Sequence, residues 1–327
     1  MKSLGLSGYA LAIGAAAALL AGCGGSQPTI GAPGAMQQSR AVAGHAAHGG
    51  SWMLPGTSGG DLIYATGGCG GTCVLSYPGG KVVGSLGTGG GAGTCADNDG
   101  NIYVANQGTL LEFAHGGTTP INTYTLSDGS IAACSVDPIT GDVAVAVFEA
   151  SYDVGVFTSP SAPAMTYVVR NGAAYCGYDN EGNLFVDSSS PTITLDELPK
   201  NGSAFAPVSI NKTLQGVAGN IQWDGSYLAV ESRGVEGAAK VSRLKIAGSS
   251  ATVVHTTKFK KIPKASLQSW IEGSQMFIPY NIRGDGQFIT HIGVWKYPKG
   301  GKQIEKYDKF PGQPDFQGVT VSAAPSH

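Results

Sequence analysis

The hexapeptide GNIYVA at residues 100–105 places a glycine and a polar residue directly before a run of apolar and aromatic residues. Glycine supplies the positive φ that a tight hairpin corner requires, and β-branched and aromatic residues favour extended backbone. The stretch therefore predicts a turn followed by a strand. The pattern also occurs at GDLIYA (60–65), GDVAVA (141–146), GNLFVD (182–187), GSYLAV (225–230) and GSQMFI (273–278).

The copies are evenly spaced. Successive first glycines are 40, 41, 41, 43 and 48 residues apart, which is the period of one four-stranded propeller blade. Each copy after the first follows another short strand. An aspartate that can bond to the turn backbone stands at four of these joints, namely Asp97, Asp137, Asp179 and Asp224. Pairs of outer strands are clearest at residues 73–86, 109–126 and 292–310.

The two ends of the repeat region complement each other. The first copy has no strand before it, whereas GVTVS, in the segment 314–325, resembles an inner strand that nothing follows. We expect this C-terminal strand to complete the first blade, which closes the ring and removes free sheet edges. Charged residues make up only 13% of the chain, and it contains 51 glycines, as suits many short strands and tight turns. The prediction is an all-β fold, a six-bladed β-propeller of four-stranded blades over residues 56–325.

The Asp-x-x-Gly-Asn turn followed by an apolar strand resembles the six-bladed propellers of NHL-repeat proteins and of the gluconolactonase (senescence marker protein) family, over about residues 58–322. The motif is specific to the fold and not to a function. The gluconolactonase resemblance implies a divalent metal, calcium or zinc, in the axial channel. Its candidate ligands here are Asn106, Asp187, Glu231 and Asn281. The first-blade glutamate of that family has no match in this chain.

The N-terminal residues predict export. Met1-Lys2 is followed by an apolar run at residues 11–20, too short to span a bilayer, and the run ends in the LAGC sequence of residues 20–23. LAGC resembles the lipobox of bacterial lipoproteins. It implies a signal peptide over residues 1–22, lipidation of Cys23 and a flexible Gly/Ala/Pro-rich tether over residues 23–55. The expected location is extracytoplasmic, anchored by lipid to the cell envelope, and Gly24 favours the outer membrane where the host has one.

An oxidising compartment permits disulfides. Cys69 and Cys73 flank a tight loop and form one candidate pair. Cys95, Cys134 and Cys176 stand at similar places in three successive inner strands. They are either small buried residues or members of a bond between neighbouring blades, Cys95–Cys134 or Cys134–Cys176.

Positive charge is concentrated near the end of the repeat region. Residues 240–309 contain 13 Lys or Arg against 4 Asp or Glu, although the whole chain has a formal net charge of -2. The candidate polyanion face is Lys258, Lys260, Lys261 and Lys264. These lysines either protect an outer strand from edge-to-edge pairing or dock on anionic envelope polymers or lipid headgroups.

The sequence contains no Gly-x-Ser-x-Gly elbow, no His-Glu-x-x-His motif and no phosphate-cradling loop. The first functional hypothesis is therefore a non-catalytic, cofactor-free binding or scaffold module. It would act as a monomer on an envelope protein or glycan, with no nucleic acid partner. The alternative is a divalent-metal-dependent, lactonase-like hydrolase with its site at the axial channel.

Overall fold

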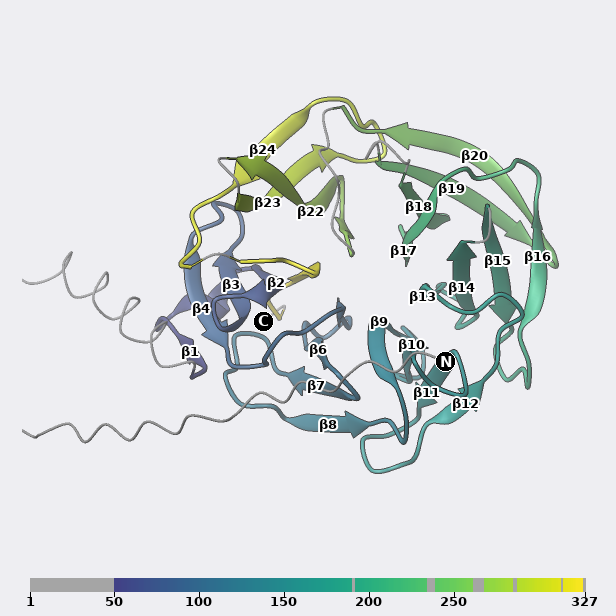
Figure 1. The fold of residues 1–327 in the computed structure, drawn as a ribbon, viewed down its shortest axis with the longest axis horizontal. Helices are drawn as coiled ribbons and strands as arrows, with labels where there is room; N and C mark the ends of the chain where they lie inside the picture. Colours follow the sequence, from purple (N-terminus) through teal and green to yellow (C-terminus); the bar gives the residue numbers. More distant parts are fainter. Residues whose placement is uncertain are drawn as a thin grey trace, which may run out of the picture.

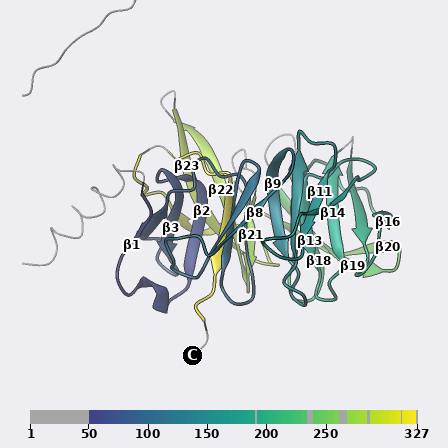
Figure 2. The ribbon, with the colours of Figure 1, turned by 90° about the horizontal axis from the view of Figure 1, so that it is seen from below.

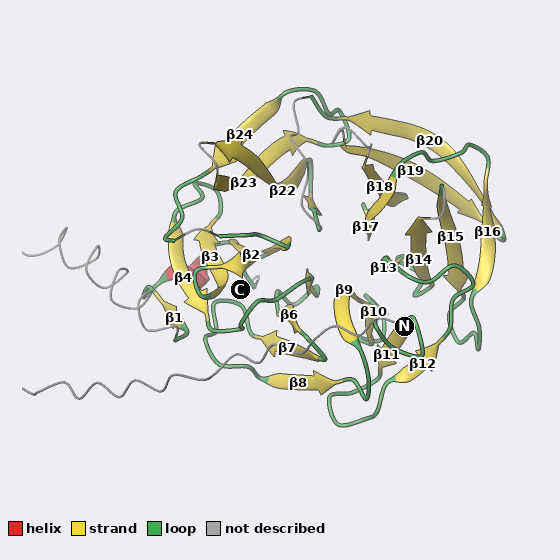
Figure 3. Ribbon diagram, in the orientation of Figure 1, coloured by secondary structure: helices red, strands yellow, loops and turns green. Residues whose placement is uncertain are grey.

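The computed structural model describes residues 50–189, 192–233, 239–260, 268–284, 287–312 and 314–325. The predicted signal peptide, Cys23 and most of the tether lie outside these ranges. The described part is almost entirely strand and loop, with one short 3₁₀ helix, η1 (Thr57–Gly59). Figure 3 shows this all-β composition, as predicted.

The strands are β1 (Trp52–Met53), β2 (Leu62–Gly68), β3 (Gly71–Ser76), β4 (Val82–Leu86), β5 (Thr94–Ala96), β6 (Ile102–Asn106), β7 (Thr109–Phe113), β8 (Asn122–Thr125), β9 (Ser130–Val136), β10 (Val143–Phe148), β11 (Val154–Phe157), β12 (Met165–Tyr167), β13 (Tyr175–Tyr178), β14 (Leu184–Ser189), β15 (Ile193–Leu198), β16 (Ala206–Ile210), β17 (Val217–Trp223), β18 (Leu228–Arg233), β19 (Ala239–Ala247), β20 (Ser250–Lys258), β21 (Trp270–Glu272), β22 (Gln275–Gly284), β23 (Gln287–Lys296), β24 (Gln303–Tyr307) and β25 (Gly318–Ser322). Every copy of the hexapeptide pattern leads into one of them, β2, β6, β10, β14, β18 and β22, here called the second strands.

The sheets radiate from a common axis as in a β-propeller (Figure 1). Three sheets have four strands, in the orders β5-β6-β7-β8, β12-β11-β10-β9 and β21-β22-β23-β24. A five-stranded sheet has the order β1-β4-β3-β2-β25. The last sheet has eight strands, β13-β14-β15-β16-β20-β19-β18-β17, because the outermost strands β16 and β20 pair in parallel over two residue pairs.

The innermost strands surround the axis. Going round it, β25 neighbours β5, β5 neighbours β9, and the series continues through β13, β17 and β21 back to β25. Each of these strands runs antiparallel to the second strand that it pairs with. All second strands therefore end on one face of the ring, and the corners between the inner and second strands lie on the other face.

The corners have the predicted chemistry. Asp97 Oδ1 accepts hydrogen bonds from the backbone N–H of Asp99 at 3.0 Å and of Asn101 at 2.8 Å, and Asp179 Oδ1 accepts two equivalent bonds at 2.9 Å. The corner glycines have positive φ at Gly100, Gly141, Gly182, Gly225 and Gly273. Gly60 differs, with φ of -136°, because no inner strand precedes it in the chain. The repeat is thus a set of aspartate-bonded hairpin corners.

The C-terminal strand closes the ring, as expected. β25 pairs with β2 along its whole length, from Leu62 opposite Ser322 to Thr66 opposite Gly318. The folded region begins earlier than the predicted end of the tether at residue 55, because Trp52 and Met53 pair with Ser85 and Gly84 on the outer strand β4. Trp52 is 6% exposed, so burial of its indole favours this extra strand.

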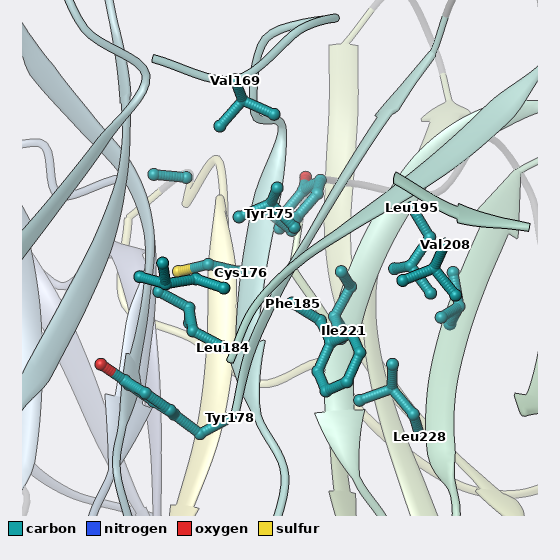
Figure 4. Packing of buried hydrophobic residues seen from close by; sticks show 14 of the residues in the cluster. Val169, Tyr175, Cys176, Tyr178, Leu184, Phe185, Leu195, Val208, Ile221 and Leu228 are labelled. Carbon is teal, nitrogen blue, oxygen red and sulfur yellow. The ribbon is translucent and has the colours of Figure 1, made fainter. Parts of the chain in front are cut away.

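Apolar side chains between adjacent sheets hold the ring together. In the cluster drawn in Figure 4, Phe185 of β14 lies near Ile221 of β17 and Leu228 of β18, and Leu184 lies on the opposite side of β14, near Cys176. These side chains are at most 3% exposed, and their cluster also includes Ala144 and Ala146 of β10 in another sheet, so the core extends between adjacent sheets. No helix in the described ranges is long and apolar enough to cross a membrane.

Candidate functional site

A cavity lies at each face of the ring, lined by the inner strands. One cavity, of about 710 Å³, lies where the second strands end, and we call it the arginine mouth. It is lined by Gly67, Gly90, Gly91, Ala92, Ala132, Phe148, Ala174, Tyr175, Val217, Ala218, Arg233, Asp315 and Gln317. The other, of about 330 Å³, lies at the corners, and we call it the corner mouth. The arginine mouth has the volume typical of small-molecule sites.

Small residues keep the arginine mouth open. Gly67 has a φ of +88°, and a Cβ atom there would lie 2.2 Å from the carbonyl oxygen of Asp315, so this position requires glycine. Phe148, at the end of β10, and Val217, at the start of β17, are 47% and 55% exposed. The mouth therefore combines a lining of small residues with two large apolar side chains that water reaches.

Arg233, the last residue of β18, supplies the positive charge of the mouth. Its Nη2 donates hydrogen bonds to the Tyr175 hydroxyl at 3.1 Å and to the Ala218 carbonyl at 2.8 Å. Its guanidinium carbon also lies 5.9 Å from the centre of the Tyr175 ring. These contacts with β13 and β17 fix the guanidinium at the cavity wall.

Two buried carboxyl groups stand behind Arg233. Asp187 of β14 and Glu231 of β18 are 1% and 2% exposed. Asp187 Oδ1 accepts the backbone N–H of Tyr175 at 3.0 Å, and Ser269 Oγ donates to Glu231 Oε2 at 2.5 Å. Asp187 Oδ2 has no hydrogen-bond partner within the part of the chain that the structure describes.

Burial governs the ionisation of this pair. It raises the pKa of Asp187 well above the ordinary aspartate value, against the opposing effects of the Tyr175 N–H and of Arg233, and Glu231 raises it further. Burial likewise raises the pKa of Glu231, although Arg233 and the Ser269 hydroxyl lower it. A buried charge is costly unless it is paired, so both carboxyls favour proton uptake more than exposed ones do.

The structure brings together two of the four candidate metal ligands. Asp187 and Glu231 interact with each other and share the positive charge of Arg233. Asn281 instead accepts a hydrogen bond from Thr290 Oγ1 at 2.6 Å and donates to Asp315 Oδ1 at 3.1 Å. The Asn106 side chain lies beside Gly89.

This donor set does not fit a divalent cation. Calcium takes roughly six to eight oxygen ligands, whereas the two carboxyls here face a guanidinium. Among the described residues, no three His, Cys, Asp or Glu side chains gather as metal ligands do.

The corner mouth contains three acidic residues, Asp97, Asp179 and Glu272, together with Trp223 and Trp270. The oxygens of Asp97 and Asp179 accept hydrogen bonds within their own turns. Trp270 Nε1 donates to Glu272 at 3.2 Å. The two aspartates are therefore explained by the corners that they stabilise, and Glu272 by its bond to Trp270.

The cysteines form two disulfides. Cys69 is bonded to Cys73 across the β2–β3 turn, and Cys95 of β5 is bonded to Cys134 of β9 in the next sheet. Cys176 remains a buried thiol, and burial raises its pKa to about 12. Of the two inter-blade pairings that the sequence allows, the structure contains Cys95–Cys134.

The lysine-rich segments adjoin one another. Lys258 and Lys260 are exposed, and the backbone around them pairs with Gly301, whose N–H donates to the Lys258 carbonyl at 2.9 Å. This pairing places the exposed Lys299 and Lys302 beside them. The candidate residues Lys261 and Lys264 lie outside the described residues.

Sequence reasoning missed Arg233. Its neighbours Asp187 and Glu231 were selected because they stand near the ends of second strands, and Arg233 stands at such an end too. Its position at the strand end was the available signal. Arg233 was not selected because the search considered only side chains that can bind a metal, and arginine is not one of them.

Comparisons with known proteins identify the fold alone. No family model matches the sequence, and no curated protein matches it. A chain from the crystal structure of a nidogen/laminin complex aligns with a TM-score of 0.59 and 11% identity, over 82% of this chain and 99% of that one. A Bacteroides caccae protein of unknown function gives a TM-score of 0.58 and 11% identity, over 80% and 99%. The β-propeller domain of Cps50 (Swd1) from "Myceliophteria thermophila" gives 0.53 and 11%, over 82% and 88%. The chain therefore has a β-propeller fold.

Proposed function

We propose that this protein is an exported lipoprotein, anchored through Cys23, whose six-bladed propeller is a binding module that takes its ligand at the arginine mouth. The LAGC sequence supports the anchor. The fold supports a binding or scaffold role, since propellers present their channel mouths and loops to partners. Replacing Cys23 with alanine should move the chain from the membrane fraction to the soluble fraction.

The count of six blades is supported by the eight-stranded sheet. Its halves, β13 to β16 and β17 to β20, each follow the connectivity of one blade, and only two parallel residue pairs join them. We attribute this joining to long outer strands that meet at the rim. Counted as two blades, the halves bring the total to the number of repeats in the sequence.

The observation that carries the binding role is the arginine mouth. A cavity of about 710 Å³ opens at the axis, its small lining residues leave it unfilled, and Arg233 supplies one charged group at its wall. Concave sites with few, well-placed polar groups are typical of ligand recognition. The poor fit of Asp187 and Glu231 to a metal favours binding over metal-dependent hydrolysis.

A filled-mouth variant tests the site. Ala132 is half-buried in the lining, so Ala132→Trp should occupy the cavity, and Ala206→Trp on the exposed outer strand β16 is the matched control. The full chain and both variants would be purified from membranes, and the small molecules released on denaturation identified by mass spectrometry. We expect at least one compound to accompany the unmodified chain and the Ala206 variant but not the Ala132 variant. Identical compounds in all three samples would refute the site.

The adjoining lysine segments favour a second contact surface. We propose that exposed Lys258, Lys260, Lys299 and Lys302 bind an anionic envelope polymer, with an attraction that salt weakens. Retention on a heparin-type resin should fall when Lys258 and Lys260 become glutamine. The control is the same change at Lys200 and Lys212, exposed lysines of another part of the ring. Equal retention of both variants would dismiss the surface.

A further inference from the structure

We infer that the corner mouth is a second binding site, which takes a sugar with an uncharged pyranose ring. The corner mouth lies on the face opposite the arginine mouth, so this inference goes beyond the binding role proposed above. Every inner strand contributes to its lining, which places the cavity on the axis. Its volume of about 330 Å³ lies at the lower end of the range typical of small-molecule sites, as suits a ligand of single-ring size.

Gln268, which stands just before β21, places an open hydrogen-bond donor at this cavity. The residue is 1% exposed, and it lines the corner mouth but not the arginine mouth. Its Oε1 accepts the backbone N–H of Thr94 on β5 at 2.7 Å, so the orientation of the amide is fixed. Gly93 and Gly318 leave room for this contact, because Cβ atoms there would lie 2.9 and 3.2 Å from Oε1. The Nε2 atom donates no hydrogen bond to the described residues, so it is available to an oxygen of a ligand.

Asn220 of β17 supplies a matching acceptor. It is 6% exposed, and its Nδ2 donates to the Ser269 carbonyl at 2.7 Å, which leaves Oδ1 without a donor from the part of the chain that the structure describes. Gln222, two residues further on, uses both ends of its amide, each bonded to the backbone of Ile271 at 2.8 Å. Because buried polar groups favour having partners, Gln268 Nε2 and Asn220 Oδ1 favour a ligand that both accepts and donates hydrogen bonds.

Two tryptophans supply an apolar wall. Trp223 of β17 and Trp270 of β21 line the mouth, and both are half-buried because each also packs against a core cluster. Trp270 Nε1 donates to Glu272 at 3.2 Å, which fixes that ring. An indole offers a large apolar surface at little cost in side-chain entropy. The C–H groups on one face of a pyranose ring can lie against such a surface while the hydroxyls at its edge form hydrogen bonds.

The charges around the mouth disfavour an anion. The lining contains the acidic residues Asp97, Asp179 and Glu272, and no Lys, Arg or His of the described ranges belongs to it. The hydrogen bonds to these three carboxyls come from uncharged backbone and side-chain groups, and no ion pair between described residues involves them. Like charges repel, so a sugar acid or a sugar phosphate suits this cavity less well than a neutral sugar.

The open amide atoms favour a hydroxyl-bearing ligand over an organic cation. A hydroxyl group can accept a hydrogen bond from Gln268 Nε2 and donate one to Asn220 Oδ1. A primary ammonium group can only donate, and a quaternary ammonium can do neither, although acidic and aromatic residues attract both. A peptide carries donors and acceptors too, but its extended chain does not suit a cavity of this size. A pyranose ring therefore satisfies the amides and the tryptophans together.

Isothermal titration with chosen sugars tests the inference. The full chain carrying Cys23→Ala would be titrated with the methyl glycosides of glucose, galactose and mannose, with the corresponding uronates, and with choline and N-acetylalaninamide. We expect at least one neutral glycoside to bind, and to bind at least about tenfold more tightly than its uronate. The inference is wrong if no neutral glycoside binds, or if a uronate, choline or N-acetylalaninamide binds as tightly as the best neutral glycoside.

Two pairs of variants locate the sugar. Ala323 is exposed and lines the corner mouth, so Ala323→Trp should fill it and weaken sugar binding by at least about tenfold, whereas Ala206→Trp on the outer strand β16 should not change it. Trp223→Ala should weaken binding by about fivefold. Ile139→Ala is its control, because it removes a 53% exposed side chain from the same face but outside the lining. Sugar affinity equal to that of the parent chain in Ala323→Trp or in Trp223→Ala would overturn the inference.

Gln268→Glu tests the donor itself. Glutamate keeps an oxygen for the Thr94 N–H but replaces Nε2 with a second oxygen, so sugar binding should weaken by at least about fivefold. Because the change adds a carboxyl at a buried position, circular dichroism and the urea midpoint establish first that the variant folds. Unchanged sugar affinity in the folded variant would refute the role of Gln268. Trp223→Ala, at a half-buried position, decides the matter if Gln268→Glu does not fold.

Discussion

Breaking the Cys95–Cys134 disulfide should destabilise the protein by about 4 kcal/mol, roughly twice the effect of breaking Cys69–Cys73. The two bonds span 39 and 4 residues of chain. In the chain-entropy account, a cross-link restricts the unfolded chain by about 2.1 + 1.5R ln n cal/mol/K, where n is the loop length. At 25 °C this gives ~3.9 kcal/mol for the longer loop and ~1.9 kcal/mol for the shorter one.

Urea unfolding with and without a thiol reductant measures the two contributions separately. Cys69→Ala/Cys73→Ala leaves only the long-loop bond, and Cys95→Ala/Cys134→Ala leaves only the short-loop bond, each in a Cys23→Ala background. Each variant is compared with itself before and after reduction, so the packing lost by the substitutions cancels. Reduction should lower the free energy of unfolding by ~4 kcal/mol in the first variant and ~2 kcal/mol in the second.

Cys176→Ala with both bonds intact is the control. Its response to reductant should match that of the parent chain, because Cys176 takes no part in either disulfide. Thiol labelling of the denatured, oxidised parent should find one free thiol. An equal response of the two double variants to reduction would refute the loop-length reasoning, and three free thiols would show that one of the two bonds does not form.

Three further outcomes follow from buried groups. Val319→Asp places a charge at a fully buried position of the closing strand β25, so it should lower the free energy of unfolding by several kcal/mol or prevent folding. Val254→Asp, at a 43% exposed outer position, should lower it by less than about 1 kcal/mol. Equal urea midpoints of the two variants would argue against closure by β25. Burial raises the pKa of Asp187, so the folded state holds a proton that the unfolded chain releases above about pH 4, and stability falls as pH rises through that window. Asp187→Asn should therefore stabilise the protein at pH 7.5 by ~1 kcal/mol or more and have little effect near pH 4; lower stability at pH 7.5 would contradict this. Burial alone would raise the pKa of Asp224, but hydrogen bonds, chiefly from Arg243, lower it below the ordinary aspartate value. The ionised carboxylate therefore stabilises the folded state above about pH 4, and this contribution is lost as pH falls through the folded-state pKa. Asp224→Asn should accordingly reduce stability at pH 7 more than at pH 3, and a pH-independent difference would count against the ion pair, whose Nε–Oδ2 distance is 2.6 Å.

The ring was predictable because its signals are local. A glycine with positive φ, an aspartate that bonds to the next turn and an alternating strand all lie within about ten residues, as at Asp97 and Gly100. Four repeats show the whole combination and all six keep the glycine before the strand, so the architecture follows from the period. The pairing of β25 with β2 was also predictable, because the first repeat lacks an inner strand and the C-terminal segment supplies one.

The site was less predictable because it depends on distances between repeats. Asp187 and Glu231 were selected as carboxylates near strand ends, but their shared neighbour Arg233 belongs to no ligand pattern. The choice of Cys134 as the partner of Cys95 depends on how neighbouring inner strands are offset. The pairing of β16 with β20 depends on the lengths of outer strands, which the repeat leaves variable.

The short strand β1 has a mechanical consequence. It attaches the N-terminal side of the ring to the outer strand β4 through two residue pairs, far from the seam where β2 and β25 meet near the axis. A force applied to the chain ahead of residue 50 would reach Trp52 and Met53 first and separate strand β1 from strand β4. The detached segment would lengthen the chain ahead of the ring while β2 and β25 stayed paired, so the propeller would yield to a pull on its N-terminal side without opening.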